Sequence, residues 1–189
     1  MKILVIIPTY NEAENLPILV SALFLLPLDL GILVVDDNSP DGTGKIADEL
    51  AQNYPDRLSV HHRISKLGLR SAYLTGFNLA LDDGAEAVAQ MDADFSHDPQ
   101  KLIEMAAQLE LCDVVLGSRY IKGGSVDENW PLWRKSLSAW GNFYARTILQ
   151  MPIRDITTGF RLWRRETIIG MPMERIQASG YIFLVEMAY

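Results

Sequence analysis

Two aspartates, Asp92 and Asp94, stand one residue apart in the segment MDADFSHDP, directly after an apolar run. Carboxylate oxygens are ligands that hard divalent cations such as Mg²⁺ and Mn²⁺ prefer, and such a cation keeps open positions for phosphate oxygens. The spacing by itself is only a weak indication of a metal site, because polar loops that leave strands have it too. The position of the segment in the fold therefore decides between a cation site and an ordinary loop.

Polar segments follow other apolar runs of the chain in the same way. The runs predict strands over 3–8, 31–37, 58–63, 86–92 and 113–119. Helical patterns between them predict helices over 12–25, 42–53, 68–83 and 99–110. This alternation indicates an α/β fold with a mainly parallel sheet, in which ligands bind at the carboxyl ends of the strands.

The strand ends therefore supply the candidate site residues, and all of them are expected along one rim of the sheet. They are the segments 8–12, 36–39, 63–66, 92–94 and 117–119. Because alternate residues of a strand point the same way, Asp92 and Asp94 could converge on one cation, with Ala93 between them.

Two of these segments have a structural interpretation beside the functional one. Thr9 and Glu12 have the spacing of a helix capping box, but Glu12 could instead bind a ribose hydroxyl and Tyr10 a base. Asp36 and Asp37 could accept hydrogen bonds from a nucleoside or could form the turn that follows them.

Familiar nucleotide-binding motifs do not explain the chain. The stretch GTGKIA at 42–47 resembles a dinucleotide fingerprint, but it follows the second strand, with Ser39, Pro40 and Asp41 intervening. The stretch DGTGK lacks the upstream glycine and the Ser or Thr of a P-loop. A dehydrogenase and a P-loop NTPase are therefore disfavoured.

Composition indicates a single globular domain of 189 residues, 49% of them apolar, with a net charge of −7. Residues 1–118 hold 7 Lys and Arg against 18 Asp and Glu, whereas residues 119–189 hold 10 against 6. An acidic half suited to a cation thus precedes a basic half suited to anions. Cys112 is the single cysteine, which excludes an internal disulfide and indicates either a reducing compartment or a protein that is indifferent to redox conditions. The first residues are interpreted as a strand rather than a signal peptide, and the apolar region 16–35 is too interrupted to span a membrane.

The basic half begins with a loop over 121–133 that contains two glycines, a proline and two tryptophans. Residues 134–150 predict a helix with Leu137, Trp140, Tyr144 and Ile148 on one face. This face either packs on the core or also touches a membrane surface, an option that the nearby Trp130 and Trp133 favour. The chain stops at GYIFLVEMAY without a helix-ending signal, so we expect a C-terminal part to be missing.

Motifs spread over nearly the whole chain resemble those of family 2 glycosyltransferases of the dolichol-phosphate (polyprenol-monophosphate) mannose synthase type. In order they are IPTYNEAENL, VVDDNSPDGT, KLGLRSAYLTGF, MDADFSHDP, LGSRY, GG…WP…R, DITTGFR and GYIFLVEM. Each motif is modest, but eight in the family order are highly specific. The resemblance implies a GT-A (Rossmann-like) fold, with 1–118 as the nucleotide-sugar and metal half and 119–189 as the acceptor half of one domain.

The resemblance also implies roles for individual residues. The nucleotide-sugar side is implied to contain Pro8, Tyr10, Glu12, Val35, Asp37, Asp92, Ala93 and, on one interpretation, Arg161. Asp92, Asp94 and Ser96 are implied for Mg²⁺ or Mn²⁺. Arg119 and Arg134 are implied to hold the acceptor phosphate, and Asp94 with these two arginines forms the expected catalytic set.

Some residues stay open or depart from the family pattern. Ser96 stands where some relatives carry a glutamine ligand, and Arg70 where a small residue is commoner. Arg161 either serves the donor or forms a salt bridge with Asp155. His97 is either a group behind the metal ligands or a histidine at the strand exit. The basic R-x-x-G-x-S-K segment that usually follows in the family and helps bind phosphates is absent from this sequence, so we expect this chain to lack part of the phosphate-binding site.

The implied reaction moves mannose from GDP-mannose to a polyprenyl (dolichyl) phosphate at the cytosolic membrane face, where the protein would be peripheral. A lipid monophosphate with a second pKa of about 6 is largely dianionic at neutral pH, so it needs no general base. Direct displacement would invert the anomeric centre. The alternatives are a glucosyl- or N-acetylglucosaminyltransferase that uses a UDP-sugar, and a non-catalytic nucleotide-sugar-binding module. Nucleic acid is not an expected partner.

Overall fold

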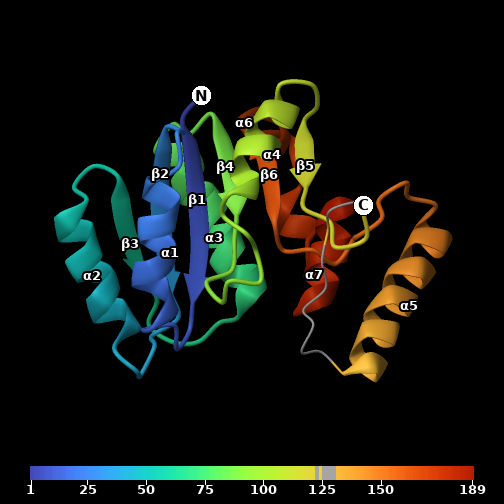
Figure 1. Ribbon diagram of the computed structural model, residues 1–189, viewed down its shortest axis with the longest axis horizontal. Coiled ribbons are helices and arrows are strands. Elements are labelled where there is room, and N and C mark those ends of the chain that lie inside the picture. Colours follow the sequence, from blue (N-terminus) through green and yellow to red (C-terminus); the bar gives the residue numbers. More distant parts are fainter. Residues whose placement is uncertain (122–123, 125–130) are drawn as a thin grey trace.

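The computed structural model describes residues 1–121, 124 and 131–189, and its centre is a six-stranded sheet (Figure 1). The strands are β1 (Ile3–Thr9), β2 (Leu30–Asp36), β3 (Leu58–His62), β4 (Ala87–Gln90), β5 (Val114–Leu116) and β6 (Arg161–Arg164). Their order in the sheet is β3-β2-β1-β4-β6-β5. The first four strands are parallel, and β6 is antiparallel to both β4 and β5. β5 therefore runs in the direction of β4, and its carboxyl end reaches the same rim.

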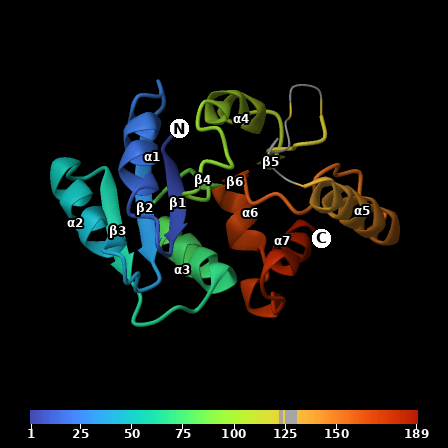
Figure 2. The same ribbon diagram turned by 60° about the horizontal axis from the view of Figure 1, so that its bottom comes forward.

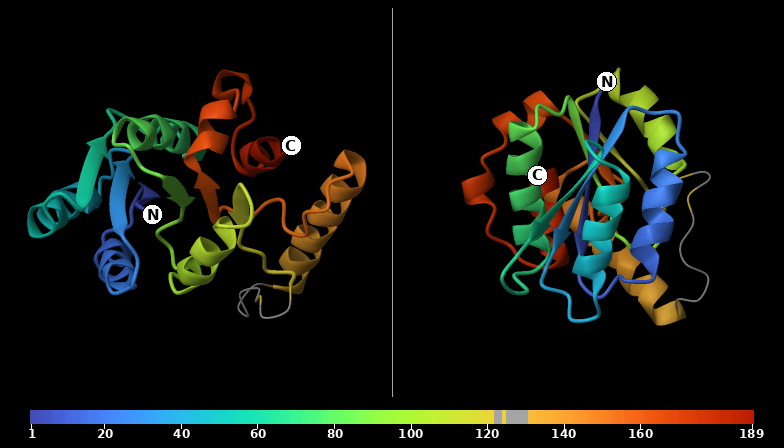
Figure 3. Two further views of the ribbon diagram at one scale, coloured as in Figure 1. Left: turned by 90° about the horizontal axis from the view of Figure 1, so that it is seen from above. Right: turned by 90° about the vertical axis from the view of Figure 1, so that its left-hand side faces the viewer.

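Helices cover both faces of the sheet. They are α1 (Asn15–Phe24), α2 (Thr43–Asn53), α3 (Leu69–Asp82), α4 (Lys101–Leu109), α5 (Leu132–Leu149), α6 (Arg165–Gly170) and α7 (Tyr181–Ala188), with a 3₁₀ turn at Met173–Arg175. Figure 3 shows α3 and α6 on one side of the sheet and α1 and α4 on the other. Two layers of core result, one on each face.

The continuous apolar runs of β1 and β2 follow from this double cover. Val5 and Ile7 pack into the core under α1 and α4, whereas Leu4 and Ile6 pack into the core under α3. Because side chains alternate across a strand, a strand buried on both faces needs apolar residues at every position. The fold class that the sequence predicts is therefore what these residues form.

Several predicted boundaries are wrong, and two of them affect the site. The predicted strand 86–92 ends at Gln90, so Asp92 and Asp94 lie in the loop beyond it and the alternation argument does not apply to them. The predicted strand 113–119 is reduced to Val114–Leu116. β6 was not predicted at all, because four residues next to a short helix carry too little periodicity to show a strand.

α5 lies at the opposite end of the molecule from α2 (Figure 2). Trp133, Trp140, Phe143 and Ile148 on this helix are each more than 60% exposed, and Trp140 stacks on Tyr144. The predicted alternative of a core-packed face is therefore wrong for Trp140, Tyr144 and Ile148. Among the helices that the structure describes, none is long and apolar enough to cross a membrane.

One buried polar side chain attaches α5 to the rest of the domain. Asn142 accepts a hydrogen bond from the Ile156 backbone N–H at 2.8 Å and donates one to the Thr157 hydroxyl at 3.2 Å. The buried Asn142 amide thus connects the helix to the segment that leads into β6, while Trp140 and Phe143 stay in solvent.

A glycine sets the distance between α3 and the sheet, and we predict that Gly76→Ala lowers stability. A Cβ at position 76 would lie 2.6 Å from Ile6 Cγ2 and 2.9 Å from Ile6 Cδ1 in the core. Overpacking of this kind costs about 1–3 kcal/mol, which exceeds the gain of about 1 kcal/mol from replacing a helical glycine. Urea unfolding followed by circular dichroism measures the change.

Gly141→Ala is the matched control, because position 141 is also helical and its Cβ would meet nothing within 4 Å. We expect this control to gain up to about 1 kcal/mol of unfolding free energy. Equal stabilisation by both substitutions would show that α3 does not depend on the close approach at Gly76.

Candidate active site

The exits of β1 and β2 form one end of the rim. The Asp37 backbone N–H donates to the Thr9 carbonyl at 3.0 Å, and the Asn11 backbone N–H donates to the Ser39 hydroxyl at 3.1 Å. Pro8 pairs with Val35 in the sheet, which brings two predicted nucleoside residues side by side. The fold therefore gathers both polar segments at one place.

Asp36 stabilises the turn after β2. Its carboxylate accepts hydrogen bonds from the Thr9 hydroxyl at 3.0 Å and from the Ser39 hydroxyl at 2.6 Å. The turn-forming interpretation of this aspartate is confirmed. The Thr9–Glu12 capping box is wrong, because Thr9 binds Asp36 and α1 begins only at Asn15.

Glu12 lies in the segment between β1 and α1, at this part of the rim. Its carboxylate accepts a hydrogen bond from the Asn15 side-chain amide at 2.8 Å, and its backbone N–H donates to the Thr43 hydroxyl at 2.9 Å. These contacts hold the β1 exit against the start of α2. The assignment of Glu12 to a ribose hydroxyl stays a prediction.

Asp37 belongs to a buried ion pair that the sequence analysis did not identify. Its Oδ1 binds the Arg63 guanidinium, and its Oδ2 accepts the Gly68 backbone N–H at 3.0 Å. Arg63 also donates to the Gly68 carbonyl at 3.1 Å, and both charged side chains are more than 90% buried. The pair joins the ends of β2 and β3 to the start of α3. The sequence signal for Arg63 was only its place in a polar strand exit.

Tyr10 is exposed at the end of β1 and contacts the β3–α3 loop. The Lys66 ammonium lies 3.6 Å from the centroid of the Tyr10 ring, a cation–π contact between the β1 exit and the β3–α3 loop. The ring therefore stands at the surface of the rim with one face against a cation. Its contact with a nucleobase stays a prediction.

The loop after β4 holds the two aspartates in different ways. Asp92 is half-buried, and its Oδ1 accepts the Tyr73 hydroxyl at 2.9 Å. Asp94 is exposed, and its Oδ1 accepts the Ser96 backbone N–H at 2.9 Å. Ala93 between them is buried. The loop thus presents Asp94 toward solvent and keeps Asp92 against the protein.

His97 stabilises the same loop from behind. Its Nδ1 accepts the Asp92 backbone N–H at 3.1 Å, and its ring stacks on Phe160 with a centroid distance of 5.1 Å. Burial lowers the pKa of His97, which agrees with a neutral ring that accepts at Nδ1. These contacts agree with the predicted interpretation of His97 as a histidine at the strand exit.

Two carboxylates fit a divalent cation whose remaining ligands come from elsewhere. Within the described residues no group of three or more His, Cys, Asp and Glu side chains gathers around a metal position. A hard cation at Asp92 and Asp94 would therefore keep positions open for water and phosphate oxygens. Ser96 lies on the exposed side of this loop, and its role as a ligand stays a prediction.

The other end of the rim carries arginines. Arg119 follows β5 and binds the buried Asp155 through two hydrogen bonds of 2.8 Å, with a third bond of 3.0 Å to the Thr157 hydroxyl. The guanidinium is thereby oriented while its side chain stays 28% exposed. The predicted loop 121–133 lies largely outside the described residues, as does the side chain of Arg134.

Arg161 is fully buried and binds backbone carbonyls. It donates to Thr158 at 3.0 Å, Ile156 at 2.9 Å and Leu184 at 2.6 Å, and burial lowers its pKa to about 10. The predicted alternative of a salt bridge with Asp155 is wrong, because Asp155 pairs with Arg119. Arg161 therefore stabilises backbone segments that lie beneath the rim.

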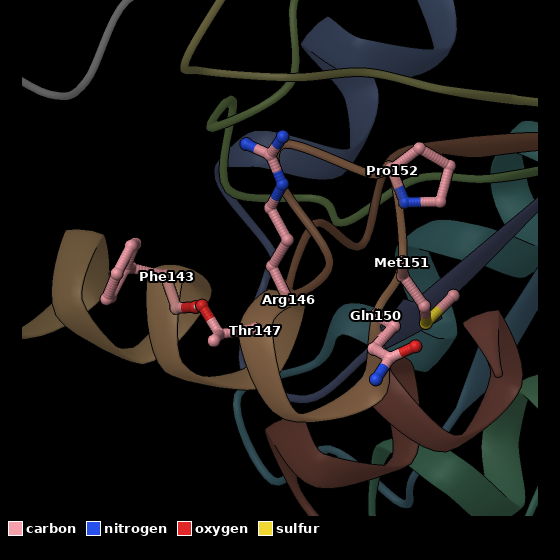
Figure 4. A pocket seen from close by; sticks show the side chains of 6 residues that line it. All are labelled: Phe143, Arg146, Thr147, Gln150, Met151 and Pro152. Atoms are coloured by element: carbon pink, nitrogen blue, oxygen red, sulfur yellow. The ribbon is translucent and has the colours of Figure 1, made fainter.

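A separate open pocket of about 580 Å³ lies beside the end of α5 (Figure 4). Phe143, Arg146, Thr147, Gln150, Met151 and Pro152 line it. None of these residues belongs to the strand exits. The pocket is therefore not a candidate for the site at the rim.

Comparison with known proteins defines the class. The model of the family described as Glycosyl transferase family 2 matches residues 4–169. The chain is 46% identical to a polyprenol monophosphomannose synthase of Mycolicibacterium smegmatis over its full length, covering 71% of that protein. It is 42% identical to an undecaprenyl-phosphate mannosyltransferase of Micrococcus luteus, again over its full length and covering 77% of that protein.

A solved structure gives the same fold. It is a mannosyltransferase from Pyrobaculum calidifontis in complex with GDP-mannose and Mn²⁺, with a TM-score of 0.64 and 18% identity. The match covers 98% of this chain and about half (51%) of that one. The fold is thus the GT-A fold of sugar-transferring enzymes. The chain belongs to glycosyl transferase family 2 and is a hexosyltransferase, which confirms the predicted resemblance.

The buried ion pair should be decisive for stability, and we predict that Arg63→Met lowers the unfolding free energy by about 3–5 kcal/mol. Removing one partner leaves the buried Asp37 carboxylate without its counter-charge. Urea unfolding measures the loss. Lys2→Met is the control, because Lys2 pairs with Asp83 at 2.7 Å on the surface, where such a pair contributes at most about 1 kcal/mol. Equal losses would mean that burial of the Arg63 pair is unimportant.

Proposed function

We propose that this chain transfers mannose from GDP-mannose to a polyprenyl phosphate with the help of Mg²⁺ or Mn²⁺. The observation that carries the proposal is the rim itself, where Asp92 and Asp94 follow β4 and Arg119 follows the parallel strand β5. A carboxylate pair suits a cation that holds a diphosphate, and an arginine suits a second phosphate. The mannosyltransferase names of the two relatives support mannose as the sugar and a polyprenyl phosphate as the acceptor.

The nucleoside of the donor is assigned to the exits of β1 and β2. Asp37 offers a carboxylate fixed by Arg63, Tyr10 offers a partly exposed ring, and Glu12 offers an acceptor for ribose hydroxyls. Pro8 and Val35 form the adjoining part of the sheet. Fixed acceptors are suited to recognition because they lose little freedom when the ligand binds. The GDP-mannose and Mn²⁺ bound to the Pyrobaculum protein support a guanine nucleotide and a metal.

The diphosphate is assigned to the loop after β4. Asp92 and Asp94 would hold the cation, and a bound Mg²⁺ or Mn²⁺ would stabilise the negative charge of the departing nucleoside diphosphate. Ala93 and Ser96 complete this loop, with the Ser96 backbone fixing the Asp94 carboxylate. Asp92 is restrained by the buried Tyr73 hydroxyl, and Asp94 by a backbone N–H of its own exposed loop.

The acceptor phosphate is assigned to Arg119 together with Arg134. An arginine fork can grip phosphate bidentately, and Asp155 keeps the Arg119 guanidinium in one orientation. The acceptor monophosphate, with a second pKa of about 6, is mostly dianionic at neutral pH. One of its oxygens attacks the anomeric carbon as the bond from that carbon to the diphosphate breaks. The configuration inverts, and no general base is required.

The proposal is tested by transfer of radiolabelled mannose from GDP-mannose to a short polyprenyl phosphate in the presence of Mn²⁺. We expect transfer by the wild type and a loss of at least about 100-fold in Asp94→Ala, since even the partners behind metal ligands are worth 10–100-fold. NMR of the product determines whether the anomeric centre inverted. Asp113→Ala is the control. Asp113 is exposed and lies just before the amino end of β5, away from the rim that the carboxyl ends of the strands form.

Changing the donor or the acceptor in this experiment distinguishes GDP-mannose transfer from the UDP-sugar and binding-module alternatives. Transfer from UDP-glucose but not from GDP-mannose would replace the mannose proposal with a uridine-sugar donor. Binding of either donor in calorimetry without transfer to the lipid would favour a nucleotide-sugar-binding module.

We further propose that the chain binds peripherally to the cytosolic face of a membrane through α5. The helix carries exposed aromatic side chains, with Arg146 in its last turn, and the acceptor of the proposed reaction is a lipid. Aromatic and basic residues on one exposed helix are typical of interfacial binding. This face would bring the lipid phosphate toward the Arg119 end of the rim.

Sedimentation with anionic vesicles tests this attachment, and we expect Trp140→Ser and Phe143→Ser each to weaken binding by roughly 10-fold or more. Burying one large apolar side chain is worth about 1.5–3 kcal/mol, and 1.4 kcal/mol corresponds to tenfold. Ile18→Ser is the control, because Ile18 is 61% exposed on α1. Unchanged binding by both α5 variants would remove this helix from the membrane contact.

A further inference from the structure

Tyr73 is a buried tyrosine whose hydroxyl reaches the candidate metal site. It lies in α3, is 0% exposed, and stacks between Phe77 and Phe183 with centroid distances of 6.4 Å to each. Its hydroxyl donates to Asp92 Oδ1 at 2.9 Å. The packing of the ring leaves this hydroxyl little choice of partner, so the hydrogen bond fixes one oxygen of the carboxylate.

The other oxygen of Asp92 lies against Gly159. A Cβ at position 159 would stand 3.1 Å from Asp92 Oδ2, which is closer than side chains usually approach, and 3.4 Å from His97 Cε1. Glycine at this position therefore leaves space beside Oδ2 that any other residue would fill. The backbone of Asp92 is fixed as well, because its N–H donates to His97.

Three features define the surroundings of Asp92, and only the Tyr73 hydroxyl binds the carboxylate itself, because His97 binds the Asp92 backbone. α3 supplies the hydroxyl, the loop before β6 supplies the gap at Gly159, and the segment after β4 supplies His97. The two oxygens consequently differ: Oδ1 already accepts a hydrogen bond, whereas Oδ2 faces the space that Gly159 leaves.

We propose that Tyr73 is a positioning residue that orients Asp92 so that Oδ2 is the oxygen offered to the divalent cation. The inference rests on the proposed function, because it assigns geometry to the same cation site. Groups that hydrogen-bond a metal ligand fix its orientation, and their loss typically costs 10–100-fold in metal affinity or activity. Gly159 has the complementary role of keeping Oδ2 accessible.

Tyr73→Phe tests the positioning role, because it removes only the hydroxyl and keeps the packed ring. Mn²⁺ binding in the presence of GDP is measured from the electron paramagnetic resonance signal of free Mn²⁺. We expect the dissociation constant of Mn²⁺ to rise by roughly 10–100-fold. Tyr54→Phe is the matched control, because Tyr54 packs on Phe24 at the end of α2, away from the rim; its Mn²⁺ affinity should equal that of the wild type.

Gly159→Ala provides an independent variant that perturbs Oδ2 rather than Oδ1. We expect it to weaken Mn²⁺ binding as well, whereas Gly141→Ala, whose Cβ meets nothing within 4 Å, should not. Far-UV circular dichroism establishes that each variant is folded. If Tyr73→Phe were unfolded, the comparison of Gly159→Ala with Gly141→Ala would decide whether the space beside Oδ2 is needed.

Kinetics separate positioning from a general structural defect. In mannosyl transfer, Tyr73→Phe should raise the half-saturating Mn²⁺ concentration while kcat at saturating Mn²⁺ stays within about threefold of the wild type. A smaller active fraction would lower kcat without moving that concentration. Wild-type affinity for Mn²⁺ in Tyr73→Phe overturns the positioning role and leaves the proposed function standing. Absence of Mn²⁺ binding by the wild type itself overturns the metal-dependent function and the inference together.

Discussion

The pairing of β6 with β4 is the interaction on which the second half of the domain depends. β4 is fully buried and pairs with β1 along one edge, so its other edge needs a partner for its backbone N–H and C=O groups. β6 fills this edge over all four residues of β4 and binds β5 with its own free edge. Arg161, the first residue of β6, adds hydrogen bonds to the carbonyls of Ile156 and Leu184. β6 and the buried Arg161 guanidinium thereby attach the end of the rim that carries Arg119 to β4, which precedes Asp92 and Asp94.

Among the residues that the structure describes, ion pairs form within each end of the rim and not between the aspartates after β4 and Arg119. Asp37 is paired with Arg63 and Asp155 with Arg119, each pair within its own end of the rim. The aspartates of the loop after β4 form no salt bridge with another described residue. An acidic loop whose carboxylates form no ion pair within the described part of the chain is suited to a cation, whereas Arg119 is suited to an anion once its orientation is fixed. The proposed reaction uses this separation, because it brings together two phosphate groups that repel each other.

The domain also separates the restrained loop after β4 from the exposed aromatic surface of α5. Tyr73 and His97 restrain the loop after β4 from the interior, where packing permits few alternatives, and Gly159 leaves space beside Asp92. α5, by contrast, is fixed to the segment before β6 through Asn142 and exposes its aromatic residues. The core thus defines the geometry of the site, and an exposed helix supplies the surface that we propose for the membrane.

The sequence by itself determined five strands of the sheet, the helices between them and the rim at their carboxyl ends. Buried parallel strands need continuous apolar runs, and such runs are visible along a chain without knowledge of contacts. It also placed Asp92 and Asp94 at that rim, although the argument from strand alternation was wrong because β4 ends at Gln90. Only the tertiary structure revealed β6, the Asp37–Arg63 pair and the restraint of Asp92 by Tyr73. Each of these contacts joins residues 19 or more positions apart. Local periodicity carries no record of such distant partners, since their geometry exists only after the sheet has brought the segments together.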